Sequence, residues 1–154
     1  MIFQSKRSGT VTLWKVSIDG GEQTQLTTAE TQLPAVSPDG KWIACLYIPV
    51  PVNEGRLAIL PAGGSRFVKT FELKGITTNI KWTPDGQSLT YSAFDLADNL
   101  WNQAIGGGPP RQITNFDTGE IFNFAWSRDG KRLAVVRGSR SQEVVLITNF
   151  RGKE

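Results

Sequence analysis

Short apolar stretches alternate with tight-turn sequences along the whole chain. In three of these turns a Ser or Thr is followed two positions later by Asp-Gly, at Asp39, Asp85 and Asp129. Apolar or aromatic residues flank each turn, so each copy predicts a β-hairpin. Asp can bond its own backbone in such a turn, and Gly accepts positive φ. We therefore expect each Asp to stabilise its own turn rather than to join a metal or acid–base site.

The hairpins are regularly spaced, with 46 positions between the first two aspartates and 44 between the last two. A second apolar strand recurs in step with them, and a glycine turn and a short strand follow it. Its four copies begin at Leu13, Leu57, Leu100 and Val144. A period in the forties with four strands per unit is typical of β-propeller blades. The sequence predicts an all-β fold, a partial β-propeller of about three and a half four-stranded antiparallel blades.

We expect a single domain over residues 1–154, and we label the strands of each blade A (innermost) to D (outermost). Residues 1–27 supply strands B, C and D of a partial blade. Residues 28–74 and 75–115 make complete blades, and residues 116–151 supply strands A, B and C of another partial blade. Propellers have about four to eight blades, so we do not expect the chain to close a ring alone. We expect it to form a homodimer, head-to-tail, with velcro closure.

Tryptophans recur at matching places in this repeat. Trp82 and Trp126 precede the turn in strand A, and Trp14 and Trp101 occupy equivalent places in strand C. An aromatic stripe can serve as a stacking platform for a sugar or a nucleic acid. Because these residues recur in register with the blade period, we favour packing between blades.

Composition narrows the chemistry that the chain can perform. It contains no histidine, which removes Ser-His-Asp and Cys-His catalysis and most zinc sites. Cys45, the one cysteine, lies in an apolar strand and is expected to be a buried, inert thiol. We expect no catalytic residue, no metal and no cofactor, and therefore no enzyme. The net charge of +3 is spread along the chain, so no nucleic-acid partner is expected.

No membrane segment is evident in the sequence. No apolar run approaches the ~20 residues that span a bilayer, and the first residues lack the apolar core of a signal peptide. We expect no membrane partner and, for the chain as written, a cytoplasmic location.

The repeat resembles a known family. The series Leu13-Trp14-Lys15-Val16, Asp19-Gly20-Gly21, Gln25-Leu26-Thr27 and Ser37-Pro38-Asp39-Gly40-Lys41 is similar to TolB-type, WD-repeat-like β-propellers. The resemblance covers nearly the whole chain. The chain is most similar to the C-terminal propellers of bacterial Ser/Thr protein kinases, and its stretch 141–151 resembles their last strand. It departs at Arg128, where the turn lacks Pro, and at 71–74, which lacks the Leu-Thr ending. It implies a fold and a bacterial source, and says little about function.

The first hypothesis for function is a non-catalytic protein-interaction or scaffold module that self-assembles into a closed ring. In a propeller the D–A and B–C loops share one face, and exposed apolar residues on such loops are typical of binding surfaces. The candidate partner-binding residues there are Pro49, Pro51, Phe94, Phe116, Asp117 and Glu120. The alternative is an accessory or gating propeller domain of a larger enzyme, linked to a kinase or a peptidase. A self-contained hydrolase or lyase is disfavoured by the absence of histidine.

Overall fold

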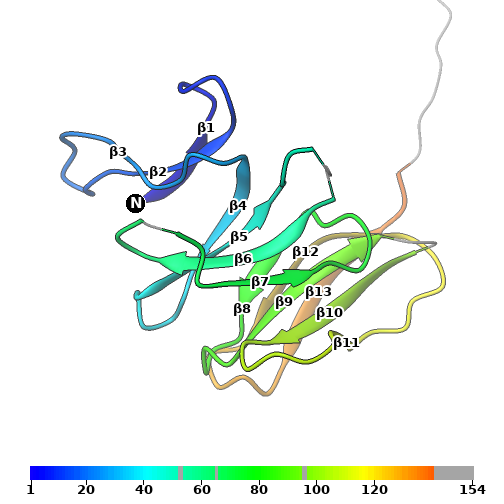
Figure 1. Ribbon diagram of the computed structural model, residues 1–154. Coiled ribbons are helices and arrows are strands. Elements are labelled where there is room, and N and C mark those ends of the chain that lie inside the picture. Colours follow the sequence, from blue (N-terminus) through cyan, green and yellow to red (C-terminus); the bar gives the residue numbers. More distant parts are fainter. Residues whose placement is uncertain (52–53, 65, 95–96, 141–154) are drawn as a thin grey trace, which may run out of the picture.

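The computed structural model describes residues 1–51, 54–64, 66–94 and 97–140. Within these ranges the chain forms thirteen strands, arranged as four antiparallel sheets that follow one another in chain order (Figure 1). It forms no helix there, and so none that is long and apolar enough to cross a bilayer. Successive antiparallel sheets of up to four strands make this all-β chain a partial β-propeller.

We call the four sheets blades 1 to 4. Blade 1 contains β1 (Ile2–Ser5), β2 (Thr12–Lys15) and β3 (Thr24–Gln25). Blade 2 contains β4 (Thr31–Val36), β5 (Trp42–Tyr47), β6 (Arg56–Pro61) and β7 (Lys69–Glu72). Blade 3 contains β8 (Ile80–Trp82), β9 (Ser88–Phe94), β10 (Asp98–Ala104) and β11 (Arg111–Gln112). In the described residues, blade 4 contains β12 (Glu120–Trp126) and β13 (Leu133–Gly138).

The observed strands A, B and C of blades 2 and 3 begin and end within two residues of the positions that the repeat predicts. These are 33–37, 41–48 and 56–61 in blade 2, and 78–82, 88–93 and 99–105 in blade 3. The outermost strands of blades 1 and 3 are short, since β3 and β11 have two residues each. An outermost strand is paired along one edge only, and both short strands are exposed to solvent. Few side chains therefore hold the ladder in place there. The fourth predicted copy of strand C, which begins at Val144, lies outside the described residues.

Each A–B turn is held by its own aspartate. In blade 2 the Ser37 hydroxyl donates to Asp39 Oδ1 at 2.6 Å, and the Lys41 backbone N–H donates to the same oxygen at 3.1 Å. These bonds to the charged form lower the pKa of the Asp39 carboxyl, the hydroxyl bond contributing most. Asp85 and Asp129 make the same two bonds, and the pKa of each is lowered for the same reason. The interpretation of these residues as turn stabilisers is confirmed.

Tryptophans of strand A bridge neighbouring blades. The Trp82 indole is 9% exposed and its Nε1–H donates to the Ala35 carbonyl of the preceding blade at 2.9 Å. The Trp126 Nε1–H likewise donates to Thr90 Oγ1 at 2.9 Å. The prediction that these two residues pack between blades is confirmed.

The core is divided among the three interfaces between consecutive blades, which we call seams. One cluster joins blades 1 and 2, a second joins blades 2 and 3, and a third joins blades 3 and 4. Cys45 lies in the first cluster with no exposed surface, and burial raises its pKa to about 12. At that pKa the thiol is inert near neutral pH, as its apolar strand predicts.

Candidate functional site

Three exposed apolar side chains come together at the end of the blades that carries the B–C and D–A loops. Ile76, Phe94 and Phe122 are 74%, 49% and 42% exposed, and all three line one pocket of about 540 Å³. Solvent-exposed clusters of large apolar side chains are uncommon unless they bind something. We call this site the apolar pocket and define it by these three residues together with Asp98, Glu120 and Arg140.

The D–A connection between blades 2 and 3 places Ile76 beside Phe94. The two residues exchange backbone hydrogen bonds, from Ile76 N–H to Phe94 O at 3.4 Å and from Phe94 N–H to Ile76 O at 3.0 Å. Gly75 makes this approach possible: its φ is +72°, and a Cβ at this position would lie 2.2 Å from the Phe94 carbonyl oxygen. Glycine at position 75 therefore shapes one wall of the pocket.

An irregularity in β12 turns Phe122 outward. The pairing of β12 with β13 shifts between Ile121 and Asn123, so that Ile121 and Phe124 are both buried while Phe122 between them is exposed. A β-bulge of this kind re-aims a side chain relative to simple alternation. The Phe122 carbonyl also accepts a hydrogen bond from Asn79 Nδ2 at 3.3 Å, which fixes the outward segment against blade 3.

Charged groups form the rim of the apolar pocket. Arg140 Nε lies 2.9 Å from Glu120 Oε2, and the Arg140 guanidinium lies 5.6 Å from the centroid of the Phe122 ring. Both charged side chains are exposed, at 67% and 39%, so the pair is weak and can exchange partners. Asp98 Oδ2 instead accepts the Ile121 backbone N–H at 2.6 Å, which anchors the start of β12. An apolar centre with a polar rim is the usual composition of a protein-binding patch.

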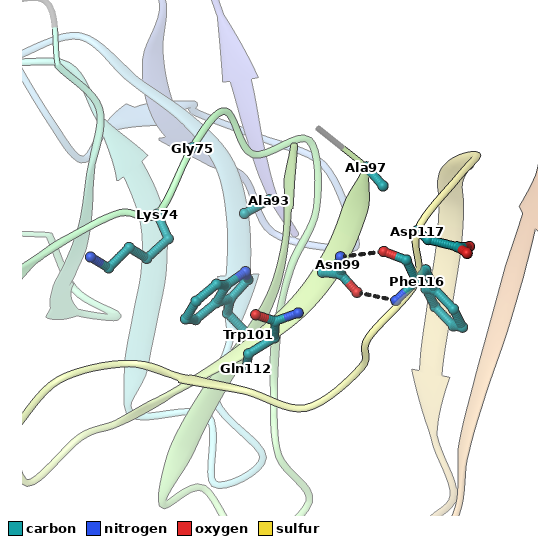
Figure 2. Close-up of a pocket in the computed structure, with 9 residues that line it drawn as sticks. All are labelled: Lys74, Gly75, Ala93, Ala97, Asn99, Trp101, Gln112, Phe116 and Asp117. Atoms are coloured by element: carbon teal, nitrogen blue, oxygen red, sulfur yellow. Dashed lines mark hydrogen bonds between the residues drawn. The ribbon is translucent and has the colours of Figure 1, made fainter. Parts of the chain in front are cut away.

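A second pocket of about 500 Å³ lies at the same end, in the seam between blades 2 and 3. Figure 2 shows the half-buried indole of Trp101 in it, with Lys74 and Asn99 on either side in this view. Asn99 is fully engaged: its amide donates to the Phe116 carbonyl at 3.0 Å and accepts the Phe116 N–H at 2.8 Å. This pocket, which we call the tryptophan pocket, therefore has one rigid wall.

Within the ranges that the structure describes, no three His, Cys, Asp or Glu side chains stand close enough to hold a metal ion. The three aspartates whose pKa is lowered lie in the A–B turns, at the opposite end from the two pockets. The thiol of Cys45 and the hydroxyl of Tyr91, whose pKa values are raised by burial, have no exposed surface on which to meet a substrate.

Comparison with solved structures identifies the fold. The chain superimposes with a TM-score of 0.73 on a protein described as a TolB from Agrobacterium tumefaciens, at 16% identity over 88% of this chain and 49% of that one. For TolB from Acinetobacter baumannii the TM-score is 0.72, at 18% identity over 90% and 35%. This is a TolB-type propeller fold. No family profile and no curated protein sequence matches the chain.

The chain also resembles part of an enzyme structure. A prolyl endopeptidase structure matches with a TM-score of 0.60, at 21% identity over 83% of this chain and 23% of that one. The chain thus spans about half, or less, of each of these three structures. At these identities the likeness establishes the propeller scaffold.

The structure distributes the predicted site residues over one end of the TolB-type arc. Phe94 and Glu120 line the apolar pocket, and Phe116 and Asp117 line the tryptophan pocket. The Phe116 ring is covered by the Arg137 guanidinium, 3.8 Å from its centroid. Pro49 and Pro51 line neither of these pockets, and residues 52 and 53 of the same loop lie outside the described residues.

Sequence reasoning missed four residues that complete the apolar pocket: Ile76, Asp98, Phe122 and Arg140. Ile76 follows a glycine in a D–A connection, and an apolar residue at such a loop position is a sequence signal for an exposed binding surface. Phe122 alternates with Phe124 in the sequence, and only the bulge reveals that the two rings point in different directions.

Proposed function

We propose that this chain is a non-catalytic propeller module that binds a segment of another protein in the apolar pocket. The observation that carries the proposal is the convergence of Ile76, Phe94 and Phe122, which come from three separate stretches of the chain and are all exposed. Large apolar side chains in a concave, polar-rimmed site are the usual anchors of protein recognition.

The size and support of the pocket favour a protein segment with one large apolar anchor. A volume of about 540 Å³ accommodates an aromatic or branched side chain and part of its neighbours. The walls are preorganised by the backbone bonds between Ile76 and Phe94 and by the bond from Asn79 to Phe122. Preorganised walls lower the entropy lost on binding.

Panning a random nonapeptide phage library against the immobilised chain tests this proposal. We expect enriched peptides to carry an aromatic or branched apolar residue, and Phe122→Ala to weaken their binding at least about tenfold, as hot-spot truncations do. Val68→Ala, at a 52% exposed position away from the pocket, is the matched control and should leave binding unchanged. Peptides that bind wild type and Phe122→Ala equally well would rule out the pocket as the site.

A second candidate function is an accessory or gating propeller of a larger enzyme. It is favoured by the likeness to a prolyl endopeptidase structure, of which this chain covers 23%. The full reading frame from which the chain derives tests it. A peptidase or kinase domain in that frame would support the accessory role, and a frame holding only propeller repeats would exclude it.

We further propose that the module self-assembles into a closed ring. The outermost faces of the described arc expose apolar side chains, including Ile18 at 92% and Val136 at 58%. Association that covers such faces is favourable by about 25 cal/mol for each Å² of apolar surface buried. Electron microscopy of the purified chain is expected to show closed rings, and images of open arcs alone would contradict the proposal.

A further inference from the structure

Blade 1 presents a face of the kind that is buried at the interior seams. Strand pairing defines equivalent positions in strands B and C of the first three blades: Phe3 with Trp14, Cys45 with Ala58, and Tyr91 with Trp101. Cys45, Ala58 and Tyr91 have no exposed surface. Cys45 and Ala58 cluster with Leu13 of the preceding blade, and Tyr91 clusters with Leu57 of its own preceding blade.

Phe3 is only half-buried, although Cys45 and Tyr91 at its place have no exposed surface, and Trp14 beside it is half-buried like its equivalent Trp101. The side chain that covers them comes from their own blade: the Arg7 guanidinium lies 5.5 Å from the centroid of the Phe3 ring and 4.9 Å from that of Trp14. The two rings are only partly covered, so the uncovered part of their apolar surface is available to a partner.

Ile18 extends the same face. Ile18 lies four residues after Trp14. Ala62 and Ile105 lie four residues after the equivalent residues of blades 2 and 3, so they hold the matching position. Both pack against the cluster in the seam with the preceding blade, whereas Ile18 is 92% exposed.

Blade 4 presents the complementary kind of face. Ala44 of blade 2 and Thr90 of blade 3 have no exposed surface, since the following blade covers them. The equivalent residue in blade 4 is Ala134, which is exposed. Two residues further along β13, Val136 is 58% exposed, while Ser92 at the same place in blade 3 is 2% exposed.

We propose that a second copy of this chain closes the ring head-to-tail, through these two faces, an inference that rests on the proposed self-assembly. The leading face consists of Phe3, Trp14 and Ile18. The trailing face consists of Ala134, Val136 and the exposed Ala125 that pairs with Ala134. The leading face of each copy docks on the trailing face of the other. Large aromatic groups meet small residues in this arrangement, as Trp82 meets Ala35 and Ala44 inside the chain.

The interior seams are the reason to assign these faces to each other. Every interior seam joins the trailing side of one blade to the leading side of the next, and the A–B turns stack in the same order. Gly86 lies against Pro38, with 3.8 Å between a Cβ placed on it and Pro38 Cδ, and Gly130 lies against Pro84 at 3.9 Å. A pair of copies carries two leading and two trailing faces, so two seams of this one kind cover all four.

Paired charge substitutions in the full chain test the head-to-tail order by analytical ultracentrifugation. Ile18→Asp blocks the leading face and Val136→Asp blocks the trailing face. We expect each variant alone to dissociate at least tenfold more readily than wild type, because both of its seams contain a buried aspartate. An equimolar mixture should recover dimers, since one seam then joins two native faces. Val68→Asp, at a 52% exposed position outside both faces, is the matched control and should dimerise like wild type.

The possible results separate the two proposals. If wild type dimerises and either variant alone dimerises equally well, like faces meet and the head-to-tail order is wrong, while self-assembly stands. A mixture that stays monomeric also overturns the order. A monomeric wild type overturns self-assembly and this inference together. Ile18→Lys and Val136→Lys replace the aspartate variants if circular dichroism shows either of those to be unfolded.

Discussion

At the scale of single residues, one carboxylate organises each A–B turn. The hydroxyl two positions earlier and the backbone N–H two positions later both donate to the same oxygen in all three copies. Arg128 takes the place of Pro in the third turn and leaves these bonds unchanged, since neither bond involves that residue. The turn therefore depends on Ser or Thr, Asp and Gly more than on Pro.

These bonds predict that the free energy of unfolding of the chain falls at acid pH. The pKa of each of Asp39, Asp85 and Asp129 lies below 3.8 in the folded state, because the bonds favour the charged form, and it returns to about 3.8 on unfolding. Their stabilisation is complete above about pH 4 and is lost as the pH falls through the folded values. In urea titrations, the variant with all three changed to Asn should lose less of its free energy of unfolding as the pH falls. An unchanged pH profile would contradict the assignment.

A second residue-scale prediction concerns the bridging tryptophans. Trp82→Ala should lower the free energy of unfolding by about 3–5 kcal/mol, because it leaves a cavity in the seam between blades 2 and 3. Trp42, which is 37% exposed, is the control, and its change to Ala should cost clearly less. Urea denaturation followed by circular dichroism measures both. Equal costs would mean that Trp82 does not hold the seam.

At the scale of elements, the sequence predicts the inner strands well and the pocket poorly. The A, B and C strands carry the alternation and turn residues that define the repeat, so their positions could be read directly. The outward direction of Phe122 depends on a bulge in β12. Leu33, whose φ is +55°, lies within a similar irregularity in β4. Simple alternation cannot reveal either, because a bulge reverses the facing of the residues beyond it.

The D–A connection between blades 2 and 3 gives the prediction at this scale. Gly75→Ala should destabilise the chain by at least about 1 kcal/mol more than Gly20→Ala. Both glycines have positive φ and share the cost of placing a Cβ there, but only at position 75 does the Cβ meet a backbone atom. Urea denaturation of the two variants decides this. Equal losses would show that the contact with Phe94 is dispensable.

At the scale of the whole molecule, the seam is the repeating unit of stability. Three seams hold the described core, and the faces at either end of the arc resemble the seam between blades 2 and 3, where Trp82 and Tyr91 of the leading side cluster with Ala44 of the trailing side. The repeat in the sequence indicated an arc. It could not indicate which side of each strand meets which neighbour, because that assignment needs the register of the sheets.

The mass of the chain in solution tests the central claim most directly. A propeller arc with two uncovered seam faces should pair with a second copy, so multi-angle light scattering at micromolar concentration should give twice the chain mass of 16.9 kDa. A stable species of 16.9 kDa under the same conditions would contradict the account, because it would mean that both seam faces remain in water without a partner.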